Sequence, residues 1–286
     1  MDERVDLHTH SNCSDGTLSP VELASLATAR QVAMLALTDH DTVAGCAAAQ
    51  SACTAYGIRF VPGIELTCGW HEREIHIVGL AIDTESTMLR AQIEDTRARR
   101  RARIAEIGRR LEKHGIAAAE PCASLIAGNA TPTRMHVARL LVAGGHATNT
   151  EQAFERFLRR GQPGHVPADW PELQATVASI HAAGGLAVLA HPHRYPLSNG
   201  QLRELCGHFK DAGGDGIEVS LAGLGPADAD RLASLARRYG LAGSIGSDFH
   251  EPGLPWRPLG RFAKLPDQVI SIVDRLRRPD SDARAP

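Results

Sequence analysis

Histidine and acidic residues follow short apolar runs at widely separated points of this 286-residue chain. His8 and His10 are separated by one residue, and so are Asp248 and His250. Because side chains two positions apart on an extended strand point the same way, both members of each pair can face one site. Neutral imidazole and ionised carboxylate are common ligands of zinc, manganese and iron. The spacing therefore predicts a divalent metal site at the ends of strands.

The elements that would position these residues alternate between strand and helix. Ser19 and Pro20 with Glu22 have the residue types of a helix start, and similar signals precede other helices. Alternation favours a largely parallel sheet, and about seven strands favour an α/β barrel over an open sheet. Strands are expected at 5–7, 34–38, 59–64, 74–80, 186–190, 216–220 and 242–245. Helices are expected at 43–56, 90–113, 133–143, 150–159, 171–183, 199–212, 226–239 and 266–277.

The pattern changes between about residues 84 and 160, where little strand signal is present. Its first helix, 90–113, has nine basic and four acidic residues. A solvated helix with local ion pairs and a helix that steers RNA backbone both explain that charge. We expect a helical insert subdomain at 84–164, a discontinuous barrel formed by 1–83 and 165–278, and a flexible tail at 279–286.

In α/β barrels the functional side chains lie at the carboxyl ends of the strands. Most of the candidate ligands are expected there, whereas His76 lies inside an apolar strand, where an inward-facing polar group needs a partner. Asp15 lies in a Ser-Asp-Gly segment that is also typical of an ordinary turn. Asp39 and Asp41 flank His40, so either could orient an imidazole or cap the next helix. The predicted metal ligands are His8, His10, Asp15, His40, Glu65, His76, His191, Asp248 and His250.

Five segments carry a resemblance to a known family. DLHTHSNCSDGTLSP, LTDHDT, PGIEL, AHPHR and GSDFH resemble the motifs of the PHP (polymerase and histidinol phosphatase) family. The resemblance implies a distorted seven-stranded (β/α) barrel, similar to amidohydrolases, with up to three metals. One metal would be held by His8, His10, Glu65 and Asp248, a second by Glu65, His76 and His191, and a third by Asp15, His40 and His250. Many family members have histidine at the position of Asp15, so the third site is more oxygen-rich here.

The segments TPTRMHVARLLV, GHVP and AHPHRY resemble the bacterial branch of this family that acts on nucleotides. That resemblance implies removal of the 3′-phosphate from 3′,5′-bisphosphorylated nucleosides such as pAp. It also implies 5′→3′ trimming of short RNA. Clustered metals suit this chemistry, because they polarise phosphoryl oxygens and a bridging water becomes a hydroxide that attacks phosphorus.

A phosphate substrate also calls for cationic and proton-transferring groups. Arg134 is the first choice, since guanidinium binds phosphate bidentately and residues 131–133 suggest a helix N-terminus that favours anions. His193 could bind phosphate or protonate the leaving oxygen. We group Arg134, His193 and Asp39 as catalytic candidates, and Arg134, His193 and Ser220 as substrate-binding candidates. Arg194 is interpreted as a surface or structural residue.

Two other functions remain open from the sequence. A histidinol-phosphate phosphatase or another phosphodiesterase would use the same metals, although the arginine-rich insert has no obvious role in it. A metal-bearing binding module would need no turnover. The expected cofactors are two or three divalent cations, with manganese first and zinc, iron or magnesium as alternatives.

Composition limits the remaining classes. The net charge of −2 gives no global signal for nucleic acid or membrane. No secretory signal or long apolar span is visible, and six cysteines without a CxxC pair suggest reduced thiols, so we expect a cytoplasmic protein. Aromatic residues are 4% of the chain, which favours a small nucleotide or short RNA over long single strands as the partner. No obligate protein partner is inferred.

Overall fold

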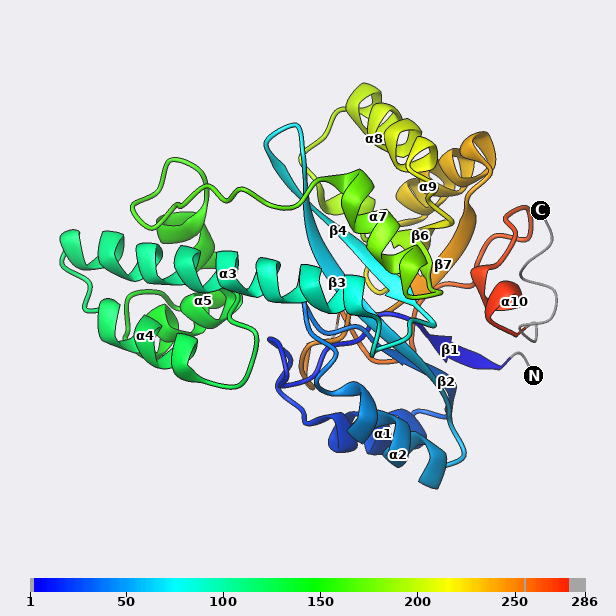
Figure 1. Ribbon diagram of the computed structural model, residues 1–286, viewed down its shortest axis with the longest axis horizontal. Coiled ribbons are helices and arrows are strands. Elements are labelled where there is room, and N and C mark those ends of the chain that lie inside the picture. The colour runs from blue at the N-terminus through cyan, green and yellow to red at the C-terminus, as the bar shows by residue number, and fades with distance from the viewer. Residues whose placement is uncertain (1–2, 255, 278–286) are drawn as a thin grey trace.

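The computed structural model describes residues 3–254 and 256–277, and its central feature is one seven-stranded sheet (Figure 1). The strands are hydrogen-bonded in the order β1-β2-β3-β4-β5-β6-β7. Their bounds are β1 Arg4–Asp6, β2 Val32–Leu37, β3 Arg59–Trp70, β4 Arg73–Leu80, β5 Leu186–Leu189, β6 Gly216–Leu221 and β7 Ala242–Gly246. All seven predicted strands are present, and β3 continues beyond its predicted end.

One strand departs from the expected parallel arrangement. β4 is antiparallel to both β3 and β5, whereas every other neighbouring pair is parallel. The cause is the two-residue connection between β3 and β4, where His71 and Glu72 have φ of 44° and 58°. Positive φ at both central residues is typical of the tight turns that join antiparallel strands. The two strands therefore form a hairpin, an antiparallel exception within the largely parallel sheet that the sequence predicts.

Hydrogen bonds also join the two ends of the sheet. Leu7 N donates to Ile245 O at 3.2 Å, and Asp248 N donates to His8 O at 2.9 Å. The close approach depends on Gly246, because a Cβ there would lie 2.5 Å from the Cβ of His8. These contacts bring the first and last strands together as a barrel requires, and they carry His8 and Asp248 to the same place.

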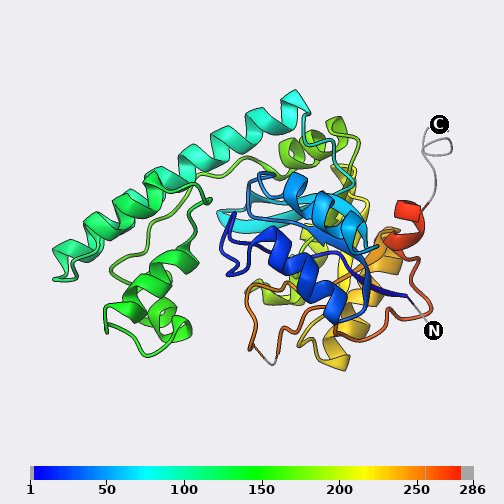
Figure 2. The same ribbon diagram turned by 90° about the horizontal axis from the view of Figure 1, so that it is seen from below.

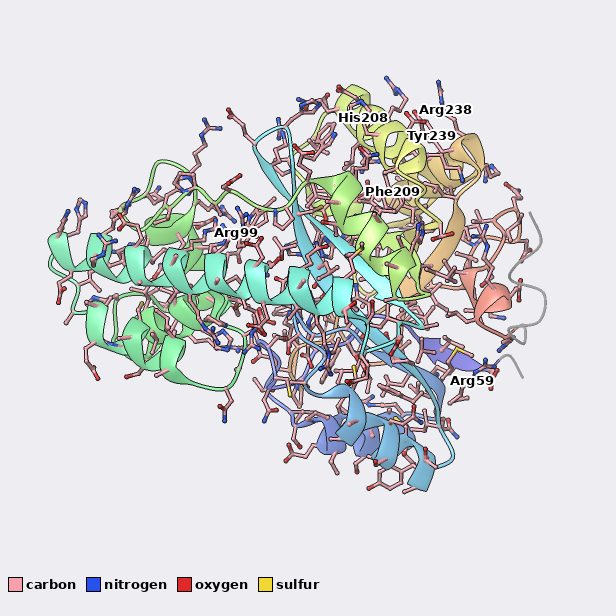
Figure 3. All side chains as sticks on the ribbon, in the orientation of Figure 1. Arg59, Arg99, His208, Phe209, Arg238 and Tyr239 are labelled. Carbon is pink, nitrogen blue, oxygen red and sulfur yellow. The ribbon has the colours of Figure 1, made fainter. Side chains whose placement is uncertain are left out.

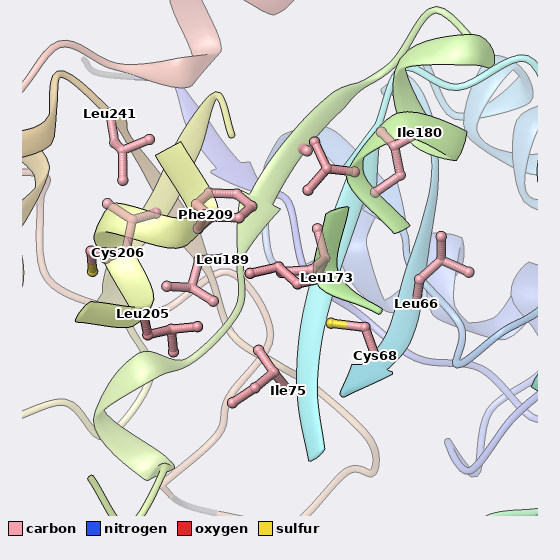
Figure 4. Close-up of a cluster of buried hydrophobic side chains, with 14 of the residues drawn as sticks. Leu66, Cys68, Ile75, Leu173, Ile180, Leu189, Leu205, Cys206, Phe209 and Leu241 are labelled. Carbon is pink, nitrogen blue, oxygen red and sulfur yellow. The ribbon is translucent and has the colours of Figure 1, made fainter. Parts of the chain in front are cut away.

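Strand residues alternate between two apolar layers. Val188 on β5 and Ala190 just after it pack inside the barrel, while Ala187 and Leu189 on β5 pack against the outer helices. Figure 4 shows Leu189 among the outer side chains, near Phe209 of a covering helix. Burial on both faces explains why these strands read as continuous apolar runs.

The helices agree with the sequence expectation in most places. Three differences stand out: the helix Ala119–Ala127 was not expected, the predicted helix 150–159 becomes a π-turn at Phe154, and the last helix begins only at Ile272. The described helices are α1 Pro20–Ala29, α2 Cys46–Ala55, α3 Thr87–Lys113, α4 Ala119–Ala127, α5 Arg134–Ala143, α6 Thr150–Ala153, η1 Phe154–Leu158, α7 Leu173–Ala182, η2 Pro192–Arg194, α8 Asn199–Asp211, α9 Pro226–Tyr239 and α10 Ile272–Arg277.

Helix α3 belongs to two packed units. Its first turns contribute Leu89 and Ile93 to the core that includes α7, whereas Ile104 and Ile107 pack with α4 and α5 in a separate apolar cluster. Figure 2 shows α3 running from the barrel to the group formed by α4, α5 and the segments around them. The separate cluster supports an insert, and we propose the division at 84–164 as predicted. Residues 278–286, and with them the predicted tail at 279–286, lie outside the described residues.

The charge of α3 is mostly used within the protein. Arg100 is buried, and it donates to Asp41 Oδ2 and to Thr67 Oγ1, each at 2.6 Å. Arg99, labelled in Figure 3, is partly exposed and pairs with Asp95 at 2.8 Å. Ion pairs of this kind account for much of the basic character of the helix, and the Arg100 contacts anchor α3 across the barrel mouth.

Two further expectations concern compartment. No helix among residues 3–254 and 256–277 combines the length and apolar character that a membrane span needs. The six cysteines are free thiols, and all except Cys13 are buried.

Replacing Arg100 with methionine is expected to destabilise the metal-free protein by about 3 kcal/mol, because Asp41 would keep a buried charge without its cation. Urea unfolding of the wild type and the variant measures the difference. The matched control is Arg99→Met, which removes a partly exposed ion pair and should cost less than about 1 kcal/mol. Equal losses for the two variants would contradict the anchoring role.

Candidate metal centre

The carboxylate of Glu65 is surrounded by imidazoles at the barrel mouth. Glu65 lies on β3 with no exposed surface, on the same side of the strand as the inward-facing Val61. Its two oxygens face different groups of histidines. Oε2 lies 3.5 Å from His8 Nε2, 3.4 Å from His10 Nε2 and 2.9 Å from His40 Nδ1, and Oε1 lies 3.0 Å from His76 Nδ1 and 2.8 Å from His191 Nε2.

Four ligand atoms form a cage on the Oε2 side. His8 Nε2 lies 3.1 Å from His10 Nε2, and Asp248 Oδ1 lies 3.4 Å from the first and 3.2 Å from the second. A cation about 2.1 Å from each ligand sets neighbouring ligand atoms about 3.0–3.4 Å apart. The distances from His8 and His10 to each other, to Glu65 and to Asp248, 3.1–3.5 Å, are close to that requirement.

Two further groups complete the cluster. His76 and His191 converge on Glu65 Oε1, on the other side of the shared carboxylate. Asp15 lies 3.3 Å from His250 Nε2 and 3.8 Å from His40 Nε2, and His10 is close enough to belong to the same group. All nine predicted ligands therefore converge at one end of the barrel, in four overlapping sets of ligand atoms that share His8, His10, His40 and Glu65.

The predicted ligands leave several of their polar atoms without hydrogen bonds to one another, as expected of side chains that bind cations. Among the described residues, several buried atoms of the cluster have no hydrogen-bond partner: His10 Nδ1, Asp15 Oδ1, His40 Nδ1, Glu65 Oε2 and His191 Nδ1. His40 Nδ1 and Glu65 Oε2 are only 2.9 Å apart, yet their contact lacks the geometry of a hydrogen bond. Buried polar atoms rarely remain unpaired. Of these atoms, His40 Nδ1, Glu65 Oε2 and Asp15 Oδ1 face other predicted ligands, so their lone pairs fit a divalent cation.

The protonation states of the clustered side chains also favour cation binding. Burial opposes the charge on Glu65, but the nearby imidazoles, first that of His40, hold the pKa of the carboxyl well below its usual range. Burial also opposes the charge on Asp248, and Arg194 and His250 outweigh it, so that the pKa lies well below its usual range. Burial and the neighbouring His250 lower the pKa of His10 to about 3. Ionised carboxylates beside a neutral imidazole form a donor set for divalent cations.

Neighbouring groups fix how the ligands are presented. Glu218 on β6 accepts from His8 Nδ1 at 2.8 Å and from the backbone N–H of His191 at 2.5 Å. With Nδ1–H donated to Glu218, His8 keeps the Nε2 lone pair for a cation. His191 and Asp248 have φ of 30° and 51°, a region that residues other than glycine seldom adopt. Strained backbone of this kind gathers at functional sites.

Asp15 is positioned by its own loop and by the insert. Asp39 accepts from Ser11 Oγ and Ser14 Oγ, each at 2.6 Å, so it braces the loop that carries Asp15. From the insert, Thr133 Oγ1 donates to Asp15 Oδ2 at 2.9 Å. The structure thus gives Asp39 a bracing contact, and its predicted catalytic role stays a prediction. Asp41 binds Thr67 and Arg100 instead of an imidazole.

Cationic side chains border the cluster on two sides. Arg194 and Arg257 both contact Asp248 Oδ2, the second at 3.1 Å, so of the two alternatives for Arg194, surface or structural, the ion pair favours the structural one. On the other side Arg134, the first residue of α5, donates to Glu74 Oε1 at 3.1 Å. His193 follows His191 in η2, and burial with the adjacent Arg194 lowers its pKa to about 4, so its imidazole is neutral near pH 7.

Ser220 makes its side-chain hydrogen bond away from the predicted ligands, and its substrate-binding role stays a prediction. It is buried on β6, and its hydroxyl donates to the backbone carbonyl of Ala263, a contact that involves no predicted ligand. Conversely, sequence reasoning missed Glu218 and Glu74. The argument that selected His76, a polar residue inside an apolar strand, also applies to Glu218 between Ile217 and Val219.

One other group has the composition of a metal site. His71, Glu204 and His208 lie together on the surface, and Figure 3 labels His208 on α8. Trp70 Nε1 donates to His208 Nδ1 at 2.9 Å, which leaves the proton of a neutral His208 on Nε2. His208 therefore cannot offer an Nε2 lone pair to a cation, and this exposed group serves as a control for the buried one.

Known proteins resemble the chain in sequence and in structure. Residues 6–116 match the family described as PHP domain. The chain is 42% identical to a 5′-3′ exoribonuclease of Haemophilus influenzae, over 96% of this chain and 100% of that protein. It is 40% identical to a 3′,5′-nucleoside bisphosphate phosphatase of Chromobacterium violaceum, over 92% of each. A solved structure of a Chromobacterium violaceum amidohydrolase with bound sulfate and no metal superposes with a TM-score of 0.90, at 38% identity over 96% of this chain and 95% of that one.

Adding Mn²⁺ to the metal-free protein is expected to raise the melting temperature by about 5 °C or more, because a cation that binds only the folded state stabilises it by mass action. Glu65→Gln should remove most of this shift, since one carboxylate serves two of the groups. Thermal scans with and without Mn²⁺ measure both effects. Glu204→Gln, in the exposed group, should keep the full shift, and a loss there instead would contradict the assignment.

Proposed function

This chain belongs to the PHP domain family, and from that premise we propose that it removes the 3′-phosphate of 3′,5′-bisphosphorylated nucleosides such as pAp, and that it also trims short RNA from the 5′ end. It is a hydrolase that acts on phosphoric ester bonds. The observation that carries the proposal is a buried cluster of carboxylates and imidazoles with guanidinium groups on two sides. Such a cluster suits an anionic substrate that binds metal.

The nine predicted ligands would hold two or three divalent cations, with manganese as our first choice. His8, His10, Glu65 and Asp248 would hold one, Glu65, His76 and His191 a second, and Asp15, His40 and His250 a third. When bound, such cations neutralise charge on phosphoryl oxygens and make a coordinated water more acidic. The mixed nitrogen and oxygen donors admit several metals, so availability also decides which one is bound.

The chain itself would bind and orient the phosphate. Arg194 and Arg257 now pair with one Asp248 oxygen, and their guanidinium groups can also donate to phosphate oxygens beside it. Arg134 approaches from the insert, with its side chain 31% exposed. His193 has a buried Nδ1 without a hydrogen-bond partner in the described part of the chain. A neutral His193 suits hydrogen bonding to a phosphate or leaving-group oxygen.

The remainder of the substrate would extend along the cavity beside the cluster. This cavity has a volume of about 1550 Å³. None of the nine predicted ligands lines it, but Glu74 and Tyr195 on its wall both contact His76. Pockets for small ligands usually measure about 300–1,000 Å³. The larger volume favours room for more than one nucleotide, which supports short RNA as a second substrate. The predicted cytoplasmic location stays a prediction.

With Mn²⁺ present, phosphate release is expected to be much faster from pAp than from AMP or histidinol phosphate, because the donors on two sides of the cluster suit a substrate with two phosphates. A phosphate-release assay across the three compounds measures the preference. Preference for histidinol phosphate would overturn the substrate, and no release from any phosphoester by the metal-loaded protein would overturn the reaction class.

Replacing Asp248 with asparagine is expected to lower turnover of pAp by more than about 100-fold, since the change removes a charge that both a cation and two arginines face. Steady-state kinetics at saturating Mn²⁺ gives the size of the loss. Glu204→Gln is the matched control, and it should keep the wild-type rate. A binding module would have no turnover to lose.

A further inference from the structure

Glu74 lies two residues before His76 on β4, so both side chains face the barrel mouth. Its carboxylate is the meeting point of donors from three other segments. Oε2 accepts from Arg103 Nη1 of α3 at 2.7 Å and from Trp170 Nε1 at 3.1 Å. Oε1 accepts from Arg134 Nη2 of α5 at 3.1 Å and lies 3.6 Å from His76 Nε2.

These contacts leave Glu74 unsuited to be a metal ligand itself. A carboxylate offers about four lone-pair sites, and each oxygen of Glu74 already faces two nitrogens. Among the described residues, Glu74 also belongs to none of the groups whose ligand atoms converge. Its role is therefore to hold other groups, and it does so on the wall of the large cavity.

On the barrel side, Glu74 faces a predicted ligand. His76 directs Nδ1 to Glu65 Oε1 at 3.0 Å, and its other nitrogen is the one that faces Glu74. Ligating histidines usually direct their second nitrogen to a carboxylate, which fixes the tautomer and the orientation of the ring. The charge of Glu74, 3.6 Å from Nε2, favours the tautomer with its proton on Nε2, and that tautomer has the Nδ1 lone pair free for a cation.

Of the three donors to Glu74, two come from the insert, and these two differ in how firmly they are held. Arg103 is buried, donates also to Val166 O at 3.0 Å, and lies 5.4 Å from the centre of the Trp170 ring. Arg134 is partly exposed, and its ring contact with Phe154 spans 5.7 Å. Glu74 is thus held in place by Arg103 and Trp170. It also accepts the one charge-assisted hydrogen bond that the Arg134 side chain makes in the described part of the chain.

We propose that Glu74 is a positioning residue that couples the helical insert to the metal centre, because one carboxylate orients both the His76 ring and the Arg134 guanidinium. The Arg134 half of this inference rests on the proposed function, whereas the His76 half requires only that the cluster binds cations. Loss of the Glu74 charge would release both groups together. Metal affinity and phosphate affinity would then fall in the same variant.

The test uses the full chain with Glu74→Gln, which keeps the shape and removes the charge. Titration of the metal-free protein with Mn²⁺ alone is expected to give one class of sites weakened about 10–100-fold, as for other outer partners of ligating histidines. With Mn²⁺ saturating, the affinity for inorganic phosphate should also fall. The matched control is Glu172→Gln, an exposed acidic residue on the same cavity wall, which should change neither affinity.

A second variant keeps the inference testable if the first does not fold. Glu74→Asp retains the charge that neutralises Arg103 but withdraws the carboxylate from His76 and Arg134, so the same loss of Mn²⁺ affinity is expected. Wild-type Mn²⁺ affinity in a folded Glu74 variant would overturn the coupling. Weakened Mn²⁺ binding in a protein whose wild type hydrolyses no phosphoester would overturn the proposed function and leave the His76 half standing.

Discussion

A buried carboxylate ringed by imidazoles is the constraint on which the rest of the structure depends. Glu65 has no exposed surface, and five histidine nitrogens lie within 3.5 Å of its oxygens. Taking such a group out of water is expensive unless a counter-charge lies beside it. The backbone at His191 and Asp248 is strained, and Gly246 allows the close approach of His8. Both features bring ligand side chains together around one or more cations.

The helical insert takes part in this centre as well as covering it. Thr133 contacts Asp15, Arg100 pairs with Asp41 next to His40, and two arginines of the insert meet Glu74 next to His76. Each contact joins an insert residue to a ligand or to the neighbour of a ligand. The barrel mouth and the insert therefore form one site, in which charged side chains of the insert compensate buried carboxylates of the barrel.

The sequence predicted this site as far as local spacing could carry it. Pairs such as His8 and His10 can be predicted because side chains two residues apart on a strand point to the same face. All nine predicted ligands converge in the structure. What sequence reasoning missed depends on contacts between distant segments. The antiparallel β4 follows from a turn with two positive φ values, and the pairing of Arg194 with Asp248 joins loops after different strands. The substrate-binding role of Ser220, whose hydroxyl donates to the backbone carbonyl of Ala263, stays a prediction.

The central claim is that Glu65 lies between bound divalent cations. Anomalous diffraction from crystals of the full chain grown with Mn²⁺ tests it most directly, because the manganese positions are seen independently of any activity. We predict anomalous peaks on both sides of the Glu65 carboxylate, one beside His8, His10 and Asp248 and another beside His76 and His191. Peaks confined to the exposed group of His71, Glu204 and His208, with none at Glu65, would contradict the account.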